Sequence, residues 1–92
     1  MAPDRVKVVI KVKTSSPLFR VSIDEKRVLL RDGAAKVDLA SGSGEHVLMW
    51  LVRDRPGASY GIEIAEPPRA KMSCKAALDA SGMDAGIFWF TL

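Results

Sequence analysis

The feature that most constrains the fold is a two-residue alternation of apolar and mostly charged side chains near the start of the chain, between Val6 and Thr14, interrupted only by Val9. The apolar members of this pattern are Val6, Val8, Ile10 and Val12. The charged members are Lys7, Lys11 and Lys13. Successive side chains of a β-strand point to opposite faces, so this segment predicts a strand with one buried and one solvated face.

The same period recurs along most of the chain, broken by turn residues such as Asp24-Glu25-Lys26, Asp32-Gly33 and Asp54-Arg55-Pro56-Gly57. The further strands that it predicts are 19–24, 27–31, 35–39, 46–53, 60–65 and 87–92. Residues 70–80 are ambiguous, because their composition favours a helix while Met72, Cys74, Ala76 and Leu78 alternate with polar residues. We prefer a strand there, because every other segment is β.

Seven or eight short strands at intervals of about 8–12 residues are typical of two sheets that bury their apolar faces against each other. We therefore expect an all-β, immunoglobulin-like two-sheet β-sandwich of seven or eight antiparallel strands, in a single domain over residues 1–92. The strand phases predict a core made of Val8, Ile10, Val12, Val21, Ile23, Val37, Leu39, Ile62 and Ile64.

The stretch 18–64 resembles the PEGA-like family of small bacterial β-sandwich domains. The resemblance is carried by Phe19 to Lys26, Ala35 to Leu39, Gly44 to Leu48 and Tyr60 to Ile64. The chain departs from the family at Glu25, where the family often has glycine, and it lacks the PEGA tetrapeptide. The resemblance implies an accessory or interaction module with no catalytic residues.

Composition excludes several classes of protein. Apolar residues make up 48% of the 92 residues and charged residues 27%, which is a globular balance. The longest apolar run, Val47 to Val52, is too short for a transmembrane helix. Residues 1–4 do not begin a basic region followed by an apolar stretch, so no secretory signal is visible and a full-length chain is expected in the cytoplasm.

Residues with catalytic or metal-binding potential are few. Gly57 to Gly61 matches the pattern G-x-S-x-G, but a nucleophile elbow needs a strand followed by a helix, and here two strands are predicted. His46 and Cys74 are the only histidine and the only cysteine, which is too few for a zinc site. We predict that Ser59 and Cys74 are chemically ordinary, that the protein is not an enzyme, and that it uses no cofactor.

Aromatic residues supply the first candidate site. Ile87, Trp89 and Thr91 should face one way and Phe88, Phe90 and Leu92 the other, and only one set can enter a two-sheet core. The sequence therefore predicts a protein-binding surface on the C-terminal strand. Its candidate residues are Trp50, Phe88, Trp89 and Phe90. The simplest partner is a second copy of the chain, in a homodimer.

The positive charge is concentrated in the first twenty residues, which hold five basic residues and one acidic residue, whereas the whole chain has a formal charge of +3. The row formed by Lys7, Lys11 and Lys13 is therefore the alternative site, for weak binding of nucleic acid or another polyanion. The chain has no asparagine and no glutamine, the amides that best read adenine. We expect a non-enzymatic protein-binding or assembly module, with polyanion binding as the alternative.

Overall fold

The structure is a computed structural model, and it describes residues 5–16, 18–40, 42 and 44–92. The expectation about the opening residues 1–4 lies outside this part of the chain. The elements are β1 (Arg5–Thr14), β2 (Leu18–Ile23), β3 (Lys26–Val28), β4 (Ala34–Ala40), β5 (Glu45–Arg53), β6 (Ser59–Glu66), the 3₁₀ turn η1 (Pro68–Ala70), β7 (Met72–Ala77) and β8 (Met83–Thr91).

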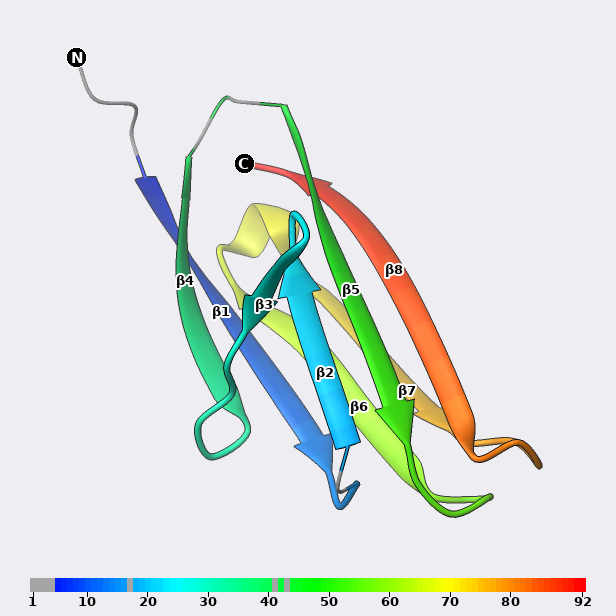
Figure 1. The fold of residues 1–92 in the computed structure, drawn as a ribbon. Helices are drawn as coiled ribbons and strands as arrows, with labels where there is room; N and C mark the ends of the chain where they lie inside the picture. The colour runs from blue at the N-terminus through cyan, green and yellow to red at the C-terminus, as the bar shows by residue number, and fades with distance from the viewer. Residues whose placement is uncertain (1–4, 17, 41, 43) are drawn as a thin grey trace.

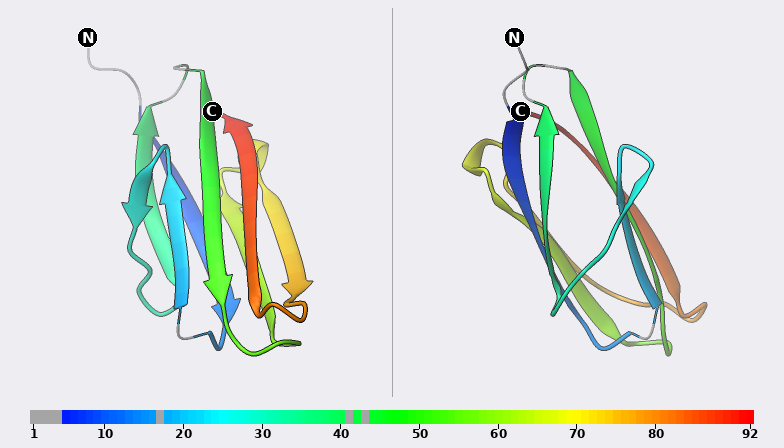
Figure 2. Two further views of the ribbon diagram at one scale, coloured as in Figure 1. Left: turned by 45° about the vertical axis from the view of Figure 1, so that its right-hand side comes forward. Right: turned by 60° about the vertical axis from the view of Figure 1, so that its left-hand side comes forward.

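The strands form two four-stranded antiparallel sheets that pack face to face (Figure 1). Sheet A has the order β4-β1-β6-β7, and sheet B has the order β3-β2-β5-β8. The right-hand view of Figure 2 separates the two layers. The predicted all-β two-sheet sandwich is thereby confirmed, and so is the preference for a strand in the ambiguous segment, where β7 follows the short turn η1.

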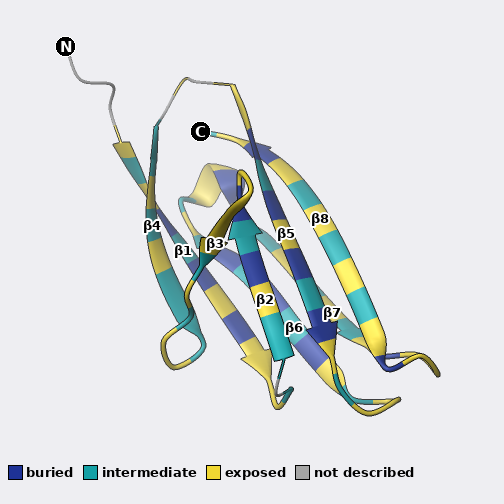
Figure 3. Ribbon diagram, in the orientation of Figure 1, coloured by how far each residue is buried: buried dark blue, intermediate teal, exposed yellow. Residues whose placement is uncertain are grey.

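The core lies between the sheets because each strand turns its apolar set inward, which gives the striped burial pattern of Figure 3. Seven of the nine predicted core residues are buried: Val8, Ile10, Val12, Val21, Ile23, Ile62 and Ile64. Val37 and Leu39 pack against this cluster but are only partly buried. They belong to β4, an edge strand, where one side of the layer is open to solvent.

The strand order decides which faces are exposed. The first strand, β1, lies inside sheet A between β4 and β6, with a register shift between Val9 and Ile10. The last strand, β8, is paired over its full length with β5 and forms an edge of sheet B. The lysine row therefore lies on the middle of a sheet face, whereas the aromatic strand lies at a sheet border.

The turn between β2 and β3 is tight, and both of its central residues, Asp24 and Glu25, have positive φ angles of 51° and 67°. Positive φ at both central positions is the geometry of a two-residue hairpin turn, which favours asparagine or aspartate followed by glycine. Glu25 therefore has a backbone conformation that suits glycine.

Candidate protein-binding face

The predicted aromatic set is divided between the core and the surface. Trp50 and Phe90 are buried, and Phe88 is partly buried and packs against the core. Trp89 points the other way and is 58% exposed, and its neighbour on the same face, Ile87, is 52% exposed. The parity argument for β8 was therefore right, but Trp50, Phe88 and Phe90 do not lie on an open surface.

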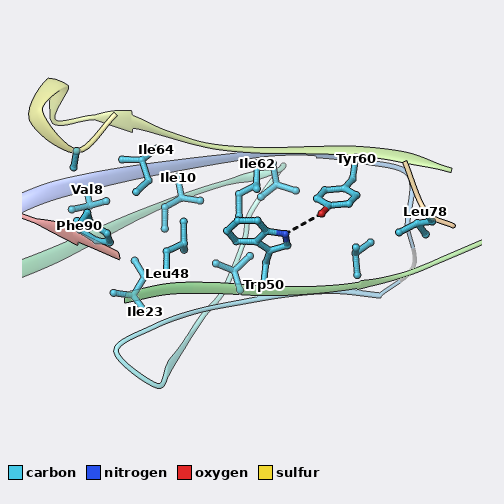
Figure 4. Packing of buried hydrophobic residues seen from close by; sticks show 14 residues of the cluster. Val8, Ile10, Ile23, Leu48, Trp50, Tyr60, Ile62, Ile64, Leu78 and Phe90 are labelled. Carbon is cyan, nitrogen blue, oxygen red and sulfur yellow. Dashed lines mark hydrogen bonds between the residues drawn. The ribbon is translucent and has the colours of Figure 1, made fainter. Parts of the chain in front are cut away.

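Trp50 is buried because two features of the sandwich hold its indole. It lies opposite Gly86 in the β5–β8 ladder, and a Cβ at Gly86 would lie only 2.0 Å from Trp50 Cζ2. Its Nε1–H donates across the sandwich to the Tyr60 hydroxyl at 3.1 Å, as Figure 4 shows. The absent side chain of Gly86 thus provides the space that the sequence pattern alone does not reveal.

Tyr60 continues this chain of hydrogen bonds by donating its hydroxyl hydrogen to Asp84 Oδ2 at 2.6 Å. Burial raises the pKa of the Tyr60 phenol, and the hydrogen bond to Asp84 raises it further, to about 12. The contacts join β5, β6 and β8, so they tie the two sheets together at a polar point within an apolar core.

An apolar surface remains on the outside of sheet B, and we call it the apolar face. Its residues are Val47, Met49 and Leu51 of β5, with Ala85, Ile87 and Trp89 of β8. They are direct cross-strand partners, in the pairs Val47 with Trp89, Met49 with Ile87, and Leu51 with Ala85. Exposed apolar side chains that adjoin in this way are typical of an interaction surface.

The apolar face is bordered on one side by basic residues. The register places Ser22 of β2 beside Met49, and Arg27 of β3 beside Ser22, while Arg20 lies beside Leu51. Arg20 and Arg27 are exposed, and they help to line a shallow hollow of about 450 Å³ over Met49, Leu51 and Ala85. Glu25 lines the same hollow, so the surface combines an apolar floor with a charged rim that contains two arginines and one glutamate.

Two of these surface residues, Met49 and Ile87, were not among the sequence-based candidates, although each is more than 40% exposed. The available signal was the apolar composition of both faces of 46–53, which indicates a strand that is covered on both sides or meets a partner. The choice of Trp50 as a candidate pointed to the buried face of β5, whereas Met49, next to it, lies on the exposed face.

Lys7, Lys11 and Lys13 are all exposed on the outer face of sheet A. Two of them have acidic cross-strand partners, because Lys7 pairs with Asp38 and Lys11 with Glu63. Opposite charges on directly opposed residues lower the net field of such a row. Only the end of the row at Lys13, which pairs with Gly61, lacks an acidic neighbour in the register.

The Lys13 end of the row borders a surface hollow of about 690 Å³. Gly61 forms part of its floor, and Lys75 of β7 lies on the other side, because Gly61 pairs with Lys75. Ser59 and Thr14 add hydroxyl groups to the lining. Two lysines facing each other across a glycine could hold an anionic group between them.

His46, Asp54 and Ser59 are the residue types of a catalytic triad, but the fold does not bring them together. His46 is the second residue of β5 and Asp54 follows the end of that strand, so about 26 Å of strand separates them. His46 is instead buried, with Nδ1 2.6 Å from Asp24 Oδ2 and Nε2 3.1 Å from the carbonyl oxygen of Ala40. Ser59 starts β6 on the exposed side, in a strand and not at a nucleophile elbow.

The His46 contact secures the β2–β3 turn, because Asp24 also accepts the backbone N–H of Val47 through Oδ1 at 2.9 Å. Partial burial works against ionisation of Asp24, but the hydrogen bonds from His46 and Val47 prevail and hold the pKa of this carboxyl below its usual value. Both ring nitrogens of His46 are engaged by oxygen atoms of Asp24 and Ala40. The arrangement is structural and leaves no ring nitrogen for a substrate.

Cys74 is partly buried and packs against the core from β7. Over the described ranges 5–16, 18–40 and 44–92, together with Gly42, no three His, Cys, Asp or Glu side chains gather in a way that could hold a metal ion. Within the same part of the chain, no helix is long and apolar enough to cross a membrane.

Comparison with known proteins gives no relative: no family model, no curated protein and no solved structure matches the chain. The surfaces of the sandwich itself are therefore the features that bear on its function.

Proposed function

We propose that this protein is a non-enzymatic binding or assembly module that contacts a protein partner through the apolar face of sheet B. The observation that carries the proposal is the adjoining pair Ile87 and Trp89, each more than half exposed on an edge strand. Burial of exposed apolar area contributes roughly 25 cal/mol per Å², so a partner that covers these side chains gains appreciable free energy. The immunoglobulin-like and PEGA-like likenesses of the sequence belong to the same proposal, because both imply an interaction module.

The chemistry of the face describes the partner that suits it. Apolar side chains of a partner would cover Met49, Ile87 and Trp89, while acidic groups would meet Arg20 and Arg27 on the rim. Aromatic and arginine residues are enriched where protein interfaces gain most of their affinity, and this face has both.

The test is a comparison of variants that share one fold. The chain is immobilised, and proteins retained from a cell extract are compared for the wild type, Trp89→Ser and the control Lys11→Ser, each checked by circular dichroism. We expect partners retained by the wild type and by Lys11→Ser to be lost with Trp89→Ser. We also expect the retained partners to remain bound in 0.5 M salt, where charges are screened within roughly 4 Å. Retention that is unaffected by Trp89→Ser would contradict the proposal.

The second candidate is binding of a polyanion at the lysine row, and the observation that favours it is the hollow over Gly61 between Lys13 and Lys75. Such binding should weaken steeply with added salt, because it depends on the release of counterions. A labelled single-stranded oligonucleotide titrated in 50 and 200 mM salt distinguishes the two candidates. A steep salt dependence that disappears in Lys13→Ser would favour this second function.

A further inference from the structure

The edge of strand β8 differs from the other sheet edges in having no charged side chain on its outer surface. The outward residues of β8 are Met83, Ala85, Ile87, Trp89 and Thr91. The remaining edge strands each carry at least one lysine: Lys26 in β3, Lys36 in β4 and Lys75 in β7. Charged residues on edge strands prevent other strands from pairing with them, and β8 has no such protection.

The direction of the β8 backbone groups follows from the hydrogen bonds that extend its ladder. Asp54 N–H donates to the carbonyl oxygen of Gly82 at 3.0 Å, so even-numbered residues of β8 turn their backbone groups toward β5. The odd-numbered residues, including Ile87 and Trp89, therefore present their N–H and C=O groups to the open edge. The same odd-numbered residues carry the exposed side chains of the apolar face.

The two ends of this edge differ. Ser81 Oγ accepts the N–H of Met83 at 3.3 Å, and Asp84 Oδ1 accepts the N–H of Ala85 at 2.9 Å. Within the described residues, no such local partner is found for the N–H groups of Ile87 and Trp89. The available donors of the edge thus lie in the half of the strand that begins at Ile87.

We propose that β8 pairs in antiparallel fashion with β8 of a second copy of this chain, centred on Ile87, so that sheet B continues across a two-fold axis. The proposal rests on the proposed function, because it specifies the partner and the mode of binding for the same surface. In this register, Ile87 N–H donates to the Ile87 carbonyl of the second copy, and Trp89 N–H to its Ala85 carbonyl. Both bonds use donors that are available in the single chain.

Side-chain size favours the same register. The indole of Trp89 lies opposite Ala85 of the second copy, so a large side chain meets a small one on the outer face. The hollow of about 280 Å³ along Phe88 to Thr91 is lined by Arg69, Lys71 and Glu45, so charges of both signs lie beside this part of the strand.

A register centred on Trp89 is less favourable. It would pair only residues 87–91 of each strand and would leave Met83 and Ala85 without partners on the opposing strand. The pairing centred on Ile87 matches residues 83–91 of both copies, so the longer ladder favours that register.

The first test is sedimentation equilibrium of the purified chain, comparing the wild type with Ile87→Pro and Ile87→Thr. Proline removes the outward N–H without affecting the bonds to β5, and edge strands accept proline at such positions. Threonine keeps the N–H and the β-branch. We expect Ile87→Pro to lower the association constant at least tenfold, and Ile87→Thr to change it less than Ile87→Pro does.

Cross-linking provides a second test that does not depend on the proline variant folding. In a Cys74→Ser background, Ile87→Cys should form a disulfide-linked dimer on mild oxidation, because position 87 lies on the two-fold axis. The control Thr91→Cys is equally exposed, but its two copies would be roughly 27 Å apart in this register, so it should remain monomeric. Equal cross-linking at both positions would refute the register.

The failure of this inference differs from the failure of the proposed function. A wild-type chain that stays monomeric at millimolar concentration overturns the self-pairing, and so does a folded Ile87→Pro variant that associates as the wild type does. The proposed function survives either result if partners from the extract still depend on Trp89. Loss of that dependence, with self-association intact, would instead overturn binding of other proteins at the apolar face.

Discussion

Replacing Gly86 with alanine tests how the sandwich encloses its buried tryptophan. The added Cβ would lie 2.0 Å from Trp50 Cζ2 and 2.2 Å from Cε2, whereas ordinary contacts begin at 3.4 Å. The indole would have to move by at least 1.4 Å, the difference between 3.4 and 2.0 Å. That movement works against the hydrogen bond from Trp50 Nε1 to the Tyr60 hydroxyl.

The expected loss of stability is the sum of two effects. Overpacking a well-packed core costs about 1–3 kcal/mol. A buried donor that loses its acceptor costs about 1–3 kcal/mol more. We therefore expect Gly86→Ala to lower the free energy of unfolding by about 2–6 kcal/mol, and the midpoint of thermal unfolding by at least about 10 °C.

The assay is urea denaturation followed by far-UV circular dichroism, so that the changed surroundings of Trp50 do not distort the signal. The matched control is Gly61→Ala, also in a strand, whose Cβ would meet its nearest atoms, in Lys75 and Cys74, at 3.6 and 3.7 Å. That variant should be as stable as the wild type or more stable, by about 0.5–1 kcal/mol, because alanine suits a strand better than glycine.

A double variant tests whether the effect of Gly86→Ala operates through the indole. If it does, Gly86→Ala should lower the free energy of unfolding by at least 1 kcal/mol less in a Trp50→Leu background than in the wild type. Coupling energies between residues in contact are roughly 0.5–3 kcal/mol. A Gly86→Ala variant within about 0.5 kcal/mol of the wild type, the range of surface substitutions, would refute the reasoning.

Three further predictions concern the core, the pH dependence and the tight turn. Ile10→Ala should lower the free energy of unfolding by about 2–5 kcal/mol in urea denaturation, because Ile10 is fully buried. The folded-state pKa of Tyr60, about 12, exceeds the usual value of 10, so the stabilising effect of the protonated phenol should be complete below pH 10 and should decline by roughly 2–3 kcal/mol as the pH rises to 12. Tyr60→Phe should remove that decline when the free energy of unfolding is measured against pH. A slope that is unchanged in Tyr60→Phe would count against the Asp84 contact. Glu25→Gly should raise the unfolding midpoint by about 4–8 °C, since relief of the positive φ is worth about 1 kcal/mol, whereas Lys26→Gly in the adjacent strand should lower it.

The alternation of residue types was sufficient to predict the strands and the facing of most side chains. Val8, Ile10 and Val12 are buried, and Lys11 and Lys13 are exposed, because a side chain's face in a strand depends on its parity alone. The same rule placed Trp89 opposite to Phe88 and Phe90 before any pairing was known. Parity is a local property, and a sequence records local properties directly.

Which face of a strand meets the other sheet, and which strand lies at an edge, are not local properties. Trp50 and Met49 lie next to each other in a strand that is apolar on both faces, and only the opposing Gly86, more than thirty residues away, decides that the indole turns inward. Likewise, the lysine row meets Asp38 and Glu63 only because β1 is paired on both sides. Such contacts arise from pairing between distant segments, so only the tertiary structure could determine where the candidate site lies.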